Sequence, residues 1–207
     1  MKSKKNKIFI GYYGISVILT YMSVVSAIIG IYFAINSHIR FALLALIISG
    51  LCDAFDGKVA RSCQRTEQEK QFGIELDSLA DLVAFIILPI TIFYGLGFTN
   101  TVNIIIFILF ALGGIIRLAY FNTLADQNSP VKCYQGLPVT STAIIFPIFY
   151  FLTMILENQT FYKIYTIIML ITALLFIINF KLKKPQTKHL IVFLIGGIIL
   201  GTIIIIL

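Results

Sequence analysis

The chain has 207 residues, of which 59% are hydrophobic and 12% are charged, and its formal net charge is +7. Soluble globular proteins average about half apolar and about a quarter charged residues, so this composition excludes a soluble globule. The apolar residues form runs of about the 20 residues that cross a bilayer, which indicates an integral membrane protein. The basic residues stand at the ends of these runs, where they orient spans, so we expect no nucleic-acid partner.

Seven apolar runs follow one another along the chain. The first begins after the lysine-rich residues 1–7 and continues to about Ile35, and because no small-residue cleavage site follows a short apolar core, we expect an uncleaved span. The others lie at about 40–61, 73–98, 101–124, 139–156, 161–180 and 189–207. The sequence therefore predicts an all-α, polytopic membrane bundle that forms one domain, residues 1–207.

The lysines and arginines are distributed unevenly between the two sides of this bundle. With a cytosolic N-terminus, all sixteen except Arg40 and Lys163 fall on the cytosolic side. This is the positive-inside pattern, and the reverse orientation would invert it. We therefore expect a cell-membrane protein with its N-terminus in the cytosol. Cys52, Cys63 and Cys133 fall on the same side and lack metal-ligand spacing, so we expect reduced, structural thiols.

Acidic residues lie at the cytosolic ends of the second and third predicted spans, and they are functional candidates because carboxylates at membrane depth are costly. One face of the second helix carries, at helical spacing, Asp53, Asp56, Gly57, Ala60 and Arg61. One face of the third carries, in the same way, Gly73, Asp77 and Asp81. Glu75 lies off this second stripe, and we expect it to be solvated or paired with a nearby basic side chain.

Carboxylates that converge in a low-dielectric site repel one another strongly unless cations neutralise them. An oxygen-only donor set without His or Cys points to hard ions: Mg²⁺, Mn²⁺ or Ca²⁺. We expect a site for two divalent ions, because such a pair clamps the attacking and leaving oxygens of a phosphoryl displacement. Small residues on the stripes would let a bulky ligand approach the backbone, and Arg61 supplies a positive fork for phosphate.

The two stripes resemble the signature of the CDP-alcohol phosphotransferases, D-x2-D-G-x2-A-R followed by G-x3-D-x3-D. Every fixed position matches, over residues 53–61 and 73–81. The spacer, residues 62–72, is longer than the family commonly has, and we expect the extra residues to alter a loop and leave the site intact. Residues 75–81, 117–122 and 136–138 resemble the ELDSLAD, RLARFN and GLP segments of the serine-using branch, with Tyr120 in place of a second arginine.

The resemblance covers about residues 50–143 and implies a six-helix catalytic core, a homodimer and a polar cavity open to the cytosol. It implies that Asp53, Asp56 and Asp77 ligate two divalent ions, Mg²⁺ or Mn²⁺, and that Asp81 both touches a metal and acts as general base. The cytidine diphosphate part of the lipid substrate would be held by Asp53, Gly57, Ala60, Arg61 and Gly73. The implied reaction transfers the phosphatidyl group of CDP-diacylglycerol to L-serine and releases CMP.

The acceptor site is the least constrained part of this hypothesis. Serine brings a carboxylate and an ammonium group, so its pocket needs a cation and a hydrogen-bond acceptor near Asp81. The candidates are Arg117, Asn122, Lys132 and Gln135. Arg117 can equally be a charge that sets topology at a span end, and Tyr120 is typical of packing or of a membrane interface.

Three alternatives stay open at this stage. Within the family, the acceptor can instead be glycerol 3-phosphate or an inositol phosphate, which would need further basic groups. A cation-coupled transporter also carries intramembrane carboxylates, but transporters usually place them near the midplane on broken helices, often with repeat symmetry. Intramembrane prenyltransferases use two Asp-rich motifs with Mg²⁺, but those motifs lie far apart and lack the interleaved Gly, Ala and Arg.

Overall fold

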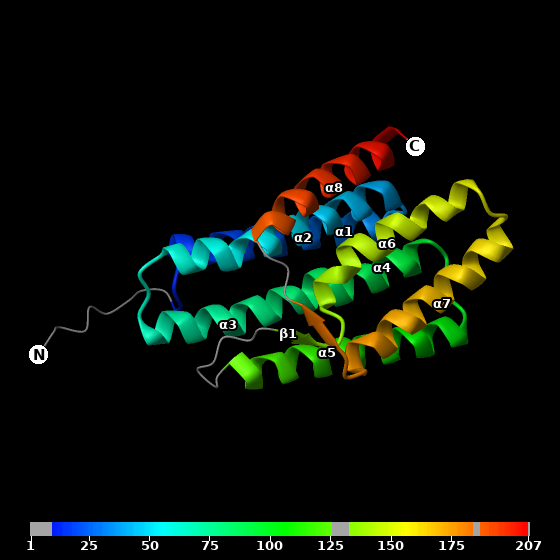
Figure 1. The fold of residues 1–207 in the computed structure, drawn as a ribbon. Helices are drawn as coiled ribbons and strands as arrows, with labels where there is room; N and C mark the ends of the chain where they lie inside the picture. The colour runs from blue at the N-terminus through cyan, green and yellow to red at the C-terminus, as the bar shows by residue number, and fades with distance from the viewer. Residues whose placement is uncertain (1–9, 126–132, 184–186, 207) are drawn as a thin grey trace, which may run out of the picture.

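The computed structural model describes residues 10–125, 133–183 and 187–206, which form a helical bundle with one short sheet (Figure 1). The first half of the chain contains η1 (Ile15–Val17), α1 (Ile18–Ile35), α2 (Ile39–Ser62), α3 (Glu67–Leu82), the π-helical turn η2 (Val83–Ile87), α4 (Leu88–Gly95) and α5 (Thr101–Ala125). The second half contains β1 (Cys133–Gln135), η3 (Val139–Ser141), α6 (Thr142–Tyr150), η4 (Phe151–Met154), α7 (Asn158–Ile177), β2 (Lys181–Lys183) and α8 (Thr187–Ile206).

The predicted all-α membrane bundle is confirmed. Each predicted span corresponds to one continuous helical stretch of the described chain, because α3, η2 and α4 run on as one helix and η3, α6 and η4 as another. By length and composition, four stretches of the described residues can cross a membrane: Ile15–Ile35, Glu67–Gly95, Thr101–Thr123 and Asn158–Ile177. Seven spans therefore stay a prediction. The helix α2 is 24 residues long but carries acidic and basic residues in its second half.

The third helix begins earlier than the sequence pattern predicts, at Glu67 rather than near residue 73. Thr66 caps it: the Thr66 hydroxyl accepts from the Glu69 N–H, and the Glu69 carboxylate accepts from the Thr66 N–H at 2.8 Å. This capping box satisfies the first free N–H groups of the helix. The expectation that the long spacer is a loop was therefore wrong, because only residues 63–66 are non-helical.

The helices α1 and α2 pack through small residues, which let two backbones approach closely in a membrane. The Ser49 hydroxyl donates to the Ser23 carbonyl at 3.0 Å, and the Ser26 hydroxyl donates to the Ala45 carbonyl at 2.9 Å. A Cβ added at Gly30 would lie 2.8 Å from the Ala45 Cβ. In Figure 1 the two helices lie side by side, and α8 lies along the same part of the bundle.

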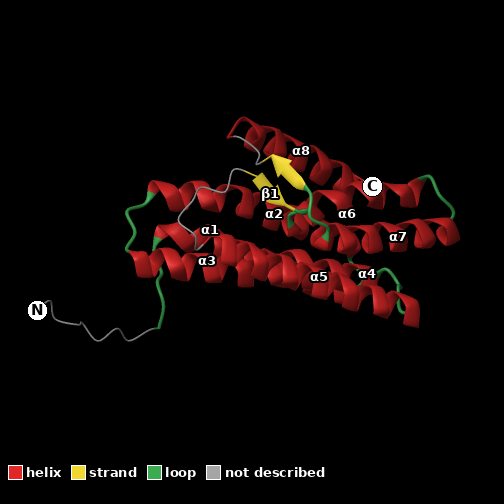
Figure 2. Cartoon of the chain, turned by 60° about the horizontal axis from the view of Figure 1, so that its bottom comes forward, coloured by secondary structure: helices red, strands yellow, loops and turns green. Residues whose placement is uncertain are grey.

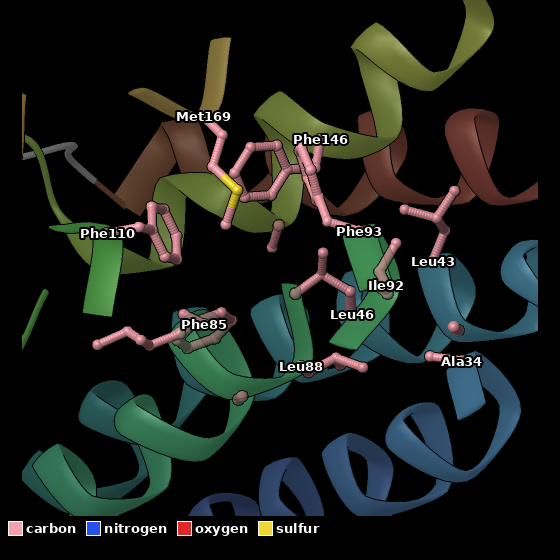
Figure 3. Close-up of a cluster of buried hydrophobic side chains, with 14 of the residues drawn as sticks. Ala34, Leu43, Leu46, Phe85, Leu88, Ile92, Phe93, Phe110, Phe146 and Met169 are labelled. Carbon is pink, nitrogen blue, oxygen red and sulfur yellow. The ribbon is translucent and has the colours of Figure 1, made fainter. Parts of the chain in front are cut away.

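The buried core combines aliphatic side chains with a cluster of aromatic rings, and Figure 3 shows part of it. Phe93 stacks on Tyr165 with ring centroids 4.3 Å apart, and Phe146 meets Phe93 edge-on at 5.0 Å. The Tyr165 hydroxyl donates to the Phe146 carbonyl at 3.0 Å, so the one polar atom of this stack has a partner. Such aromatic pairs add to the free energy gained by burial. This aromatic stack thus holds α4, α6 and α7 together.

The sequence did not predict the two-stranded sheet. The strands β1 and β2 pair antiparallel, with Gln135 opposite Lys181 (Figure 2). Next to the sheet, the Gly136 N–H donates to the Phe180 carbonyl at 2.8 Å. Gly136 has φ +74°, and a Cβ there would lie 3.0 Å from the Phe176 carbonyl oxygen, so this close approach requires glycine. The sheet fixes the segment after α5 against the end of α7.

Candidate active site

Four aspartates from two helices meet in one cluster. One carboxylate oxygen from each of Asp53, Asp56 and Asp77 lies within 4.8 Å of the others. The Asp81 carboxylate lies next to that of Asp53, and the Asp77 carboxylate lies next to that of Asp56. The two acidic stripes predicted from the sequence therefore face each other across α2 and α3. Glu75, which the spacing placed off the stripe, is exposed.

The cluster has the donor chemistry of a divalent-cation site. Its ligands are carboxylate oxygens, the donors that Mg²⁺ and Mn²⁺ prefer, and its charges repel one another without a cation. Asp56 is buried, while Asp53, Asp77 and Asp81 are half-buried, so an ion can be reached by a substrate from outside. The acidic triad of Asp53, Asp56 and Asp77 can bind a metal.

A residue of α1 positions one of the carboxylates. The Thr20 hydroxyl donates to Asp56 Oδ2 at 3.3 Å, and both side chains are buried. Thr20 was not among the predicted site residues. The signal for it was present, because Thr20 and Ser23 lie three residues apart in an otherwise apolar run, and polar groups inside a span usually bond to another helix.

The small residues of the signature lie on the same two helices as the aspartates of the cluster. Gly57, Ala60 and Gly73 are half-buried. A Cβ added at Gly57 would lie 3.4 Å from Nη1 of Arg61, whose side chain is exposed. At Gly73 an added Cβ would lie 3.6 Å from Nη1 of Arg65, a residue that the sequence did not single out.

The residues predicted to bind the acceptor fall into two groups. Arg117 is buried, and Gln135 and Tyr120 share a hydrogen bond of 2.6 Å from the tyrosine hydroxyl to the glutamine carbonyl oxygen. These three side chains line one cavity of about 290 Å³ between α5, the end of α7 and β1. Tyr120 thus has a polar contact in addition to the packing role predicted for it. Lys132 lies outside the described residues.

Asn122 contacts α3 and does not line the cavity that contains Arg117 and Gln135. Its carbonyl oxygen accepts from the Ser78 hydroxyl at 2.9 Å, so it joins α5 to α3 at the residue that follows Asp77. The structure therefore brings Arg117 and Gln135 together and sets Asn122 nearer the acidic stripe. The sequence does not predict a role for Ser78, because Ser78 lies between the stripe positions and its hydrogen-bond partner is 44 residues away.

A known protein family matches most of this chain. The family model for CDP-alcohol phosphatidyltransferase matches residues 14–200, which include both acidic stripes and nearly all of the described helices. The chain belongs to the CDP-alcohol phosphatidyltransferase family. The predicted resemblance is confirmed, and the family match extends well beyond residues 50–143.

Curated proteins named CDP-diacylglycerol--serine O-phosphatidyltransferase resemble the chain over half or more of its length. The CDP-diacylglycerol--serine O-phosphatidyltransferase of Saccharomyces cerevisiae is 36% identical over 128 residues, which are 54% of this chain and 45% of the relative. The protein of that name from Helicobacter pylori strain J99 is 34% identical over 62% of this chain and 53% of its own length. The one from Methanocaldococcus jannaschii is 32% identical over 84% of this chain and 76% of its own length. The chain thus spans about half the length of the first two relatives.

Proposed function

We propose that this protein transfers the phosphatidyl group of CDP-diacylglycerol to L-serine and releases CMP. Two things support the proposal: its membership of the CDP-alcohol phosphatidyltransferase family and the names of the relatives described above. The observation that carries it is the acidic cluster, because three of the four fixed aspartates of the family signature have carboxylate oxygens within 4.8 Å of one another instead of lying on separate surfaces.

The donor set fits two divalent cations, Mg²⁺ or Mn²⁺, held by Asp53, Asp56, Asp77 and Asp81. When bound, such ions would offset the charge of the carboxylates and of the substrate diphosphate. The nucleotide part would lie at the open side of the cluster. The small side chains of Gly57, Ala60 and Gly73 would leave room for the nucleotide there. Asp53 would border the nucleotide, and Arg61 can donate to a phosphate oxygen.

Asp81 is the proposed general base. The hydroxyl oxygen of serine attacks the phosphorus that carries diacylglycerol, the bond from that phosphorus to the CMP oxygen breaks, and the serine proton passes to Asp81. Asp81 suits this role because its carboxylate lies next to that of Asp53 but is not one of the three whose oxygens converge.

The serine would be held by Arg117, Asn122 and Gln135, together with Lys132. The guanidinium of Arg117 suits the serine carboxylate, and the carbonyl oxygens of Gln135 and Asn122 suit its ammonium group. Arg117 and Gln135 support this because they line one cavity, and Asn122 supports it because its partner Ser78 neighbours the acidic stripe.

We also propose that the chain is one domain in the cell membrane and acts as a homodimer, with its N-terminus and active site in the cytosol. The uneven distribution of lysines and arginines supports this orientation. The large number of exposed apolar side chains, including Ile105, Ile108 and Leu112 on α5, supports contact with lipid or a second copy. Chemical cross-linking in native membranes tests the dimer.

The test of the proposed function is serine-dependent release of CMP by the purified protein in lipid nanodiscs. We expect CMP release from CDP-diacylglycerol to require serine and to be lost in Asp53→Asn and Asp77→Asn. The matched control is Glu75→Gln, which removes an exposed carboxylate from the same helix as Asp77. Release of CMP that does not depend on serine, or that survives both aspartate substitutions, would contradict the proposal.

A further inference from the structure

Arg65 lies in the short connection between α2 and α3, one residue before the capping Thr66. Its side chain extends over α3, so that Nη1 is 3.6 Å from the position of a Cβ added at Gly73. Its Nε is buried and, within the described part of the chain, has no hydrogen-bond partner. The guanidinium therefore lies on the same face of α3 as the acidic stripe, and its Nε–H is available to donate a hydrogen bond.

The nearby carboxylates do not account for this placement. Glu69 is engaged in the capping box with Thr66, and Glu67 pairs with Lys70 at 2.7 Å. Arg65 lies outside α3, one residue before the N-cap Thr66, and both acidic residues of the first turn of α3 thus have other partners.

The spacing of groups along α3 indicates which anion the Arg65 guanidinium can bind. Gly73, Asp77 and Asp81 follow one another at intervals of about one turn, so Gly73 is about 6 Å from Asp77 and about 12 Å from Asp81 along the helix axis. In the proposed reaction, attack would take place at the level of Asp81, and the diphosphate would lie at the level of the acidic triad. A guanidinium beside Gly73 would therefore approach the diphosphate from the side remote from Asp81, which would be the side of the nucleotide phosphate.

A second arginine mirrors this arrangement on α2. Nη1 of Arg61 is 3.4 Å from the Cβ position of Gly57, as Nη1 of Arg65 is close to that of Gly73. Gly57 on α2 and Gly73 on α3 thus each have the guanidinium of an arginine alongside. Two planar guanidinium groups beside these two glycines are suited to a phosphate with several free oxygens.

We propose that Arg65 is a positioning residue that donates to the phosphate of the CMP part of the substrate. This inference rests on the proposed function and adds to it a phosphate contact from outside the family signature. Arg65 would hold the phosphate that stays with CMP when the phosphatidyl group leaves, so its loss should weaken nucleotide binding rather than proton transfer.

The experiment measures binding of CMP and of cytidine, by isothermal titration calorimetry with Mg²⁺ or Mn²⁺, to the purified full chain and its variants. We expect Arg65→Ala to weaken CMP binding about tenfold, as loss of a charge-assisted hydrogen bond does, and to leave cytidine binding unchanged. Arg65→Lys should recover part of the CMP affinity. Lys70→Ala is the matched control, because it removes one positive charge from the adjacent turn and should leave both affinities unchanged.

Unchanged CMP binding in Arg65→Ala would overturn the inference, and so would an equal loss of affinity for CMP and cytidine, which indicates a structural role. The thermal unfolding midpoint of each variant identifies a folding defect, and in that case Arg65→Gln, which keeps the length of the side chain, decides by the same criterion. The proposed function fails separately: wild-type protein that binds CMP no better than cytidine would contradict that function, and the inference would fall with it.

Discussion

Replacing Asp81 by asparagine should abolish most of the turnover while leaving the fold and the nucleotide site in place. Asparagine has the size of aspartate, and its amide N–H can donate to the carboxylate of Asp53, which lies next to residue 81. The converging oxygens of the acidic triad come from other residues, so the metal site keeps its core. What the substitution removes is the ability of residue 81 to accept a proton.

Loss of a general base costs about 10²- to 10⁴-fold in rate. At 1.36 kcal/mol for each factor of ten, this corresponds to about 3–5 kcal/mol of lost transition-state stabilisation. Initial rates of CMP release over a range of serine and CDP-diacylglycerol concentrations would give kcat and KM, and calorimetry would give the affinity for CMP. We expect the whole effect in kcat, with the CMP affinity changed only slightly.

The matched control is Glu75→Gln, because Glu75 is an exposed carboxylate on the same helix. It should alter kcat by no more than about twofold, as surface substitutions usually do. If Asp81→Asn kept more than about a tenth of the wild-type kcat, Asp81 would not be the base. A parallel loss of CMP affinity would instead make Asp81 chiefly a metal ligand.

Four further predictions test the remaining parts of the account. Excess EDTA should abolish activity, and Mg²⁺ or Mn²⁺ but not Zn²⁺ should restore it, since all the ligands are oxygens; activity that persists in EDTA refutes a metal requirement. In a background without native cysteines, Gln64→Cys should react with an impermeant thiol reagent only from the cytosolic side and Gln159→Cys only from the outside, and the opposite pattern reverses the topology. Arg117→Ala should raise the KM for serine or lower kcat more than it weakens CDP-diacylglycerol binding, and unchanged serine kinetics would remove this residue from the acceptor site. Gly50→Ala would place a Cβ 2.6 Å from that of Ala143, so it should lower the free energy of unfolding by about 1–3 kcal/mol. Thermal denaturation in detergent measures this change, and an unchanged unfolding midpoint would refute the close packing of these two helices.

The acidic site could be predicted from the sequence because helical periodicity fixes which residues share a face. Asp53 and Asp56 are three residues apart, and Asp77 and Asp81 are four apart, so each pair had to lie on one side of its helix. The charges of the aspartates predict that the two stripes face each other, because carboxylates at membrane depth are costly unless they meet around a common ligand.

Other contacts could not be predicted, because they depend on how distant segments pack. Thr20 reaches Asp56 across 36 residues, and Ser78 reaches Asn122 across 44. The pairing of Gln135 with Lys181 needs α5 and α7 to end side by side, which no local pattern indicates. The start of α3 is a different case, because the capping box of Thr66 and Glu69 can be read from the sequence, whereas the apolar run begins only after it.

The identity of the lipid product tests the central claim most directly. Purified protein in nanodiscs that contain CDP-diacylglycerol would be offered serine, glycerol 3-phosphate and an inositol phosphate together, and the lipids would be analysed by mass spectrometry. The account predicts phosphatidylserine as the main product, formed in a one-to-one ratio with CMP and absent from Asp81→Asn. A product that carries glycerol phosphate or inositol phosphate would contradict the serine assignment and leave the family reaction with a different acceptor.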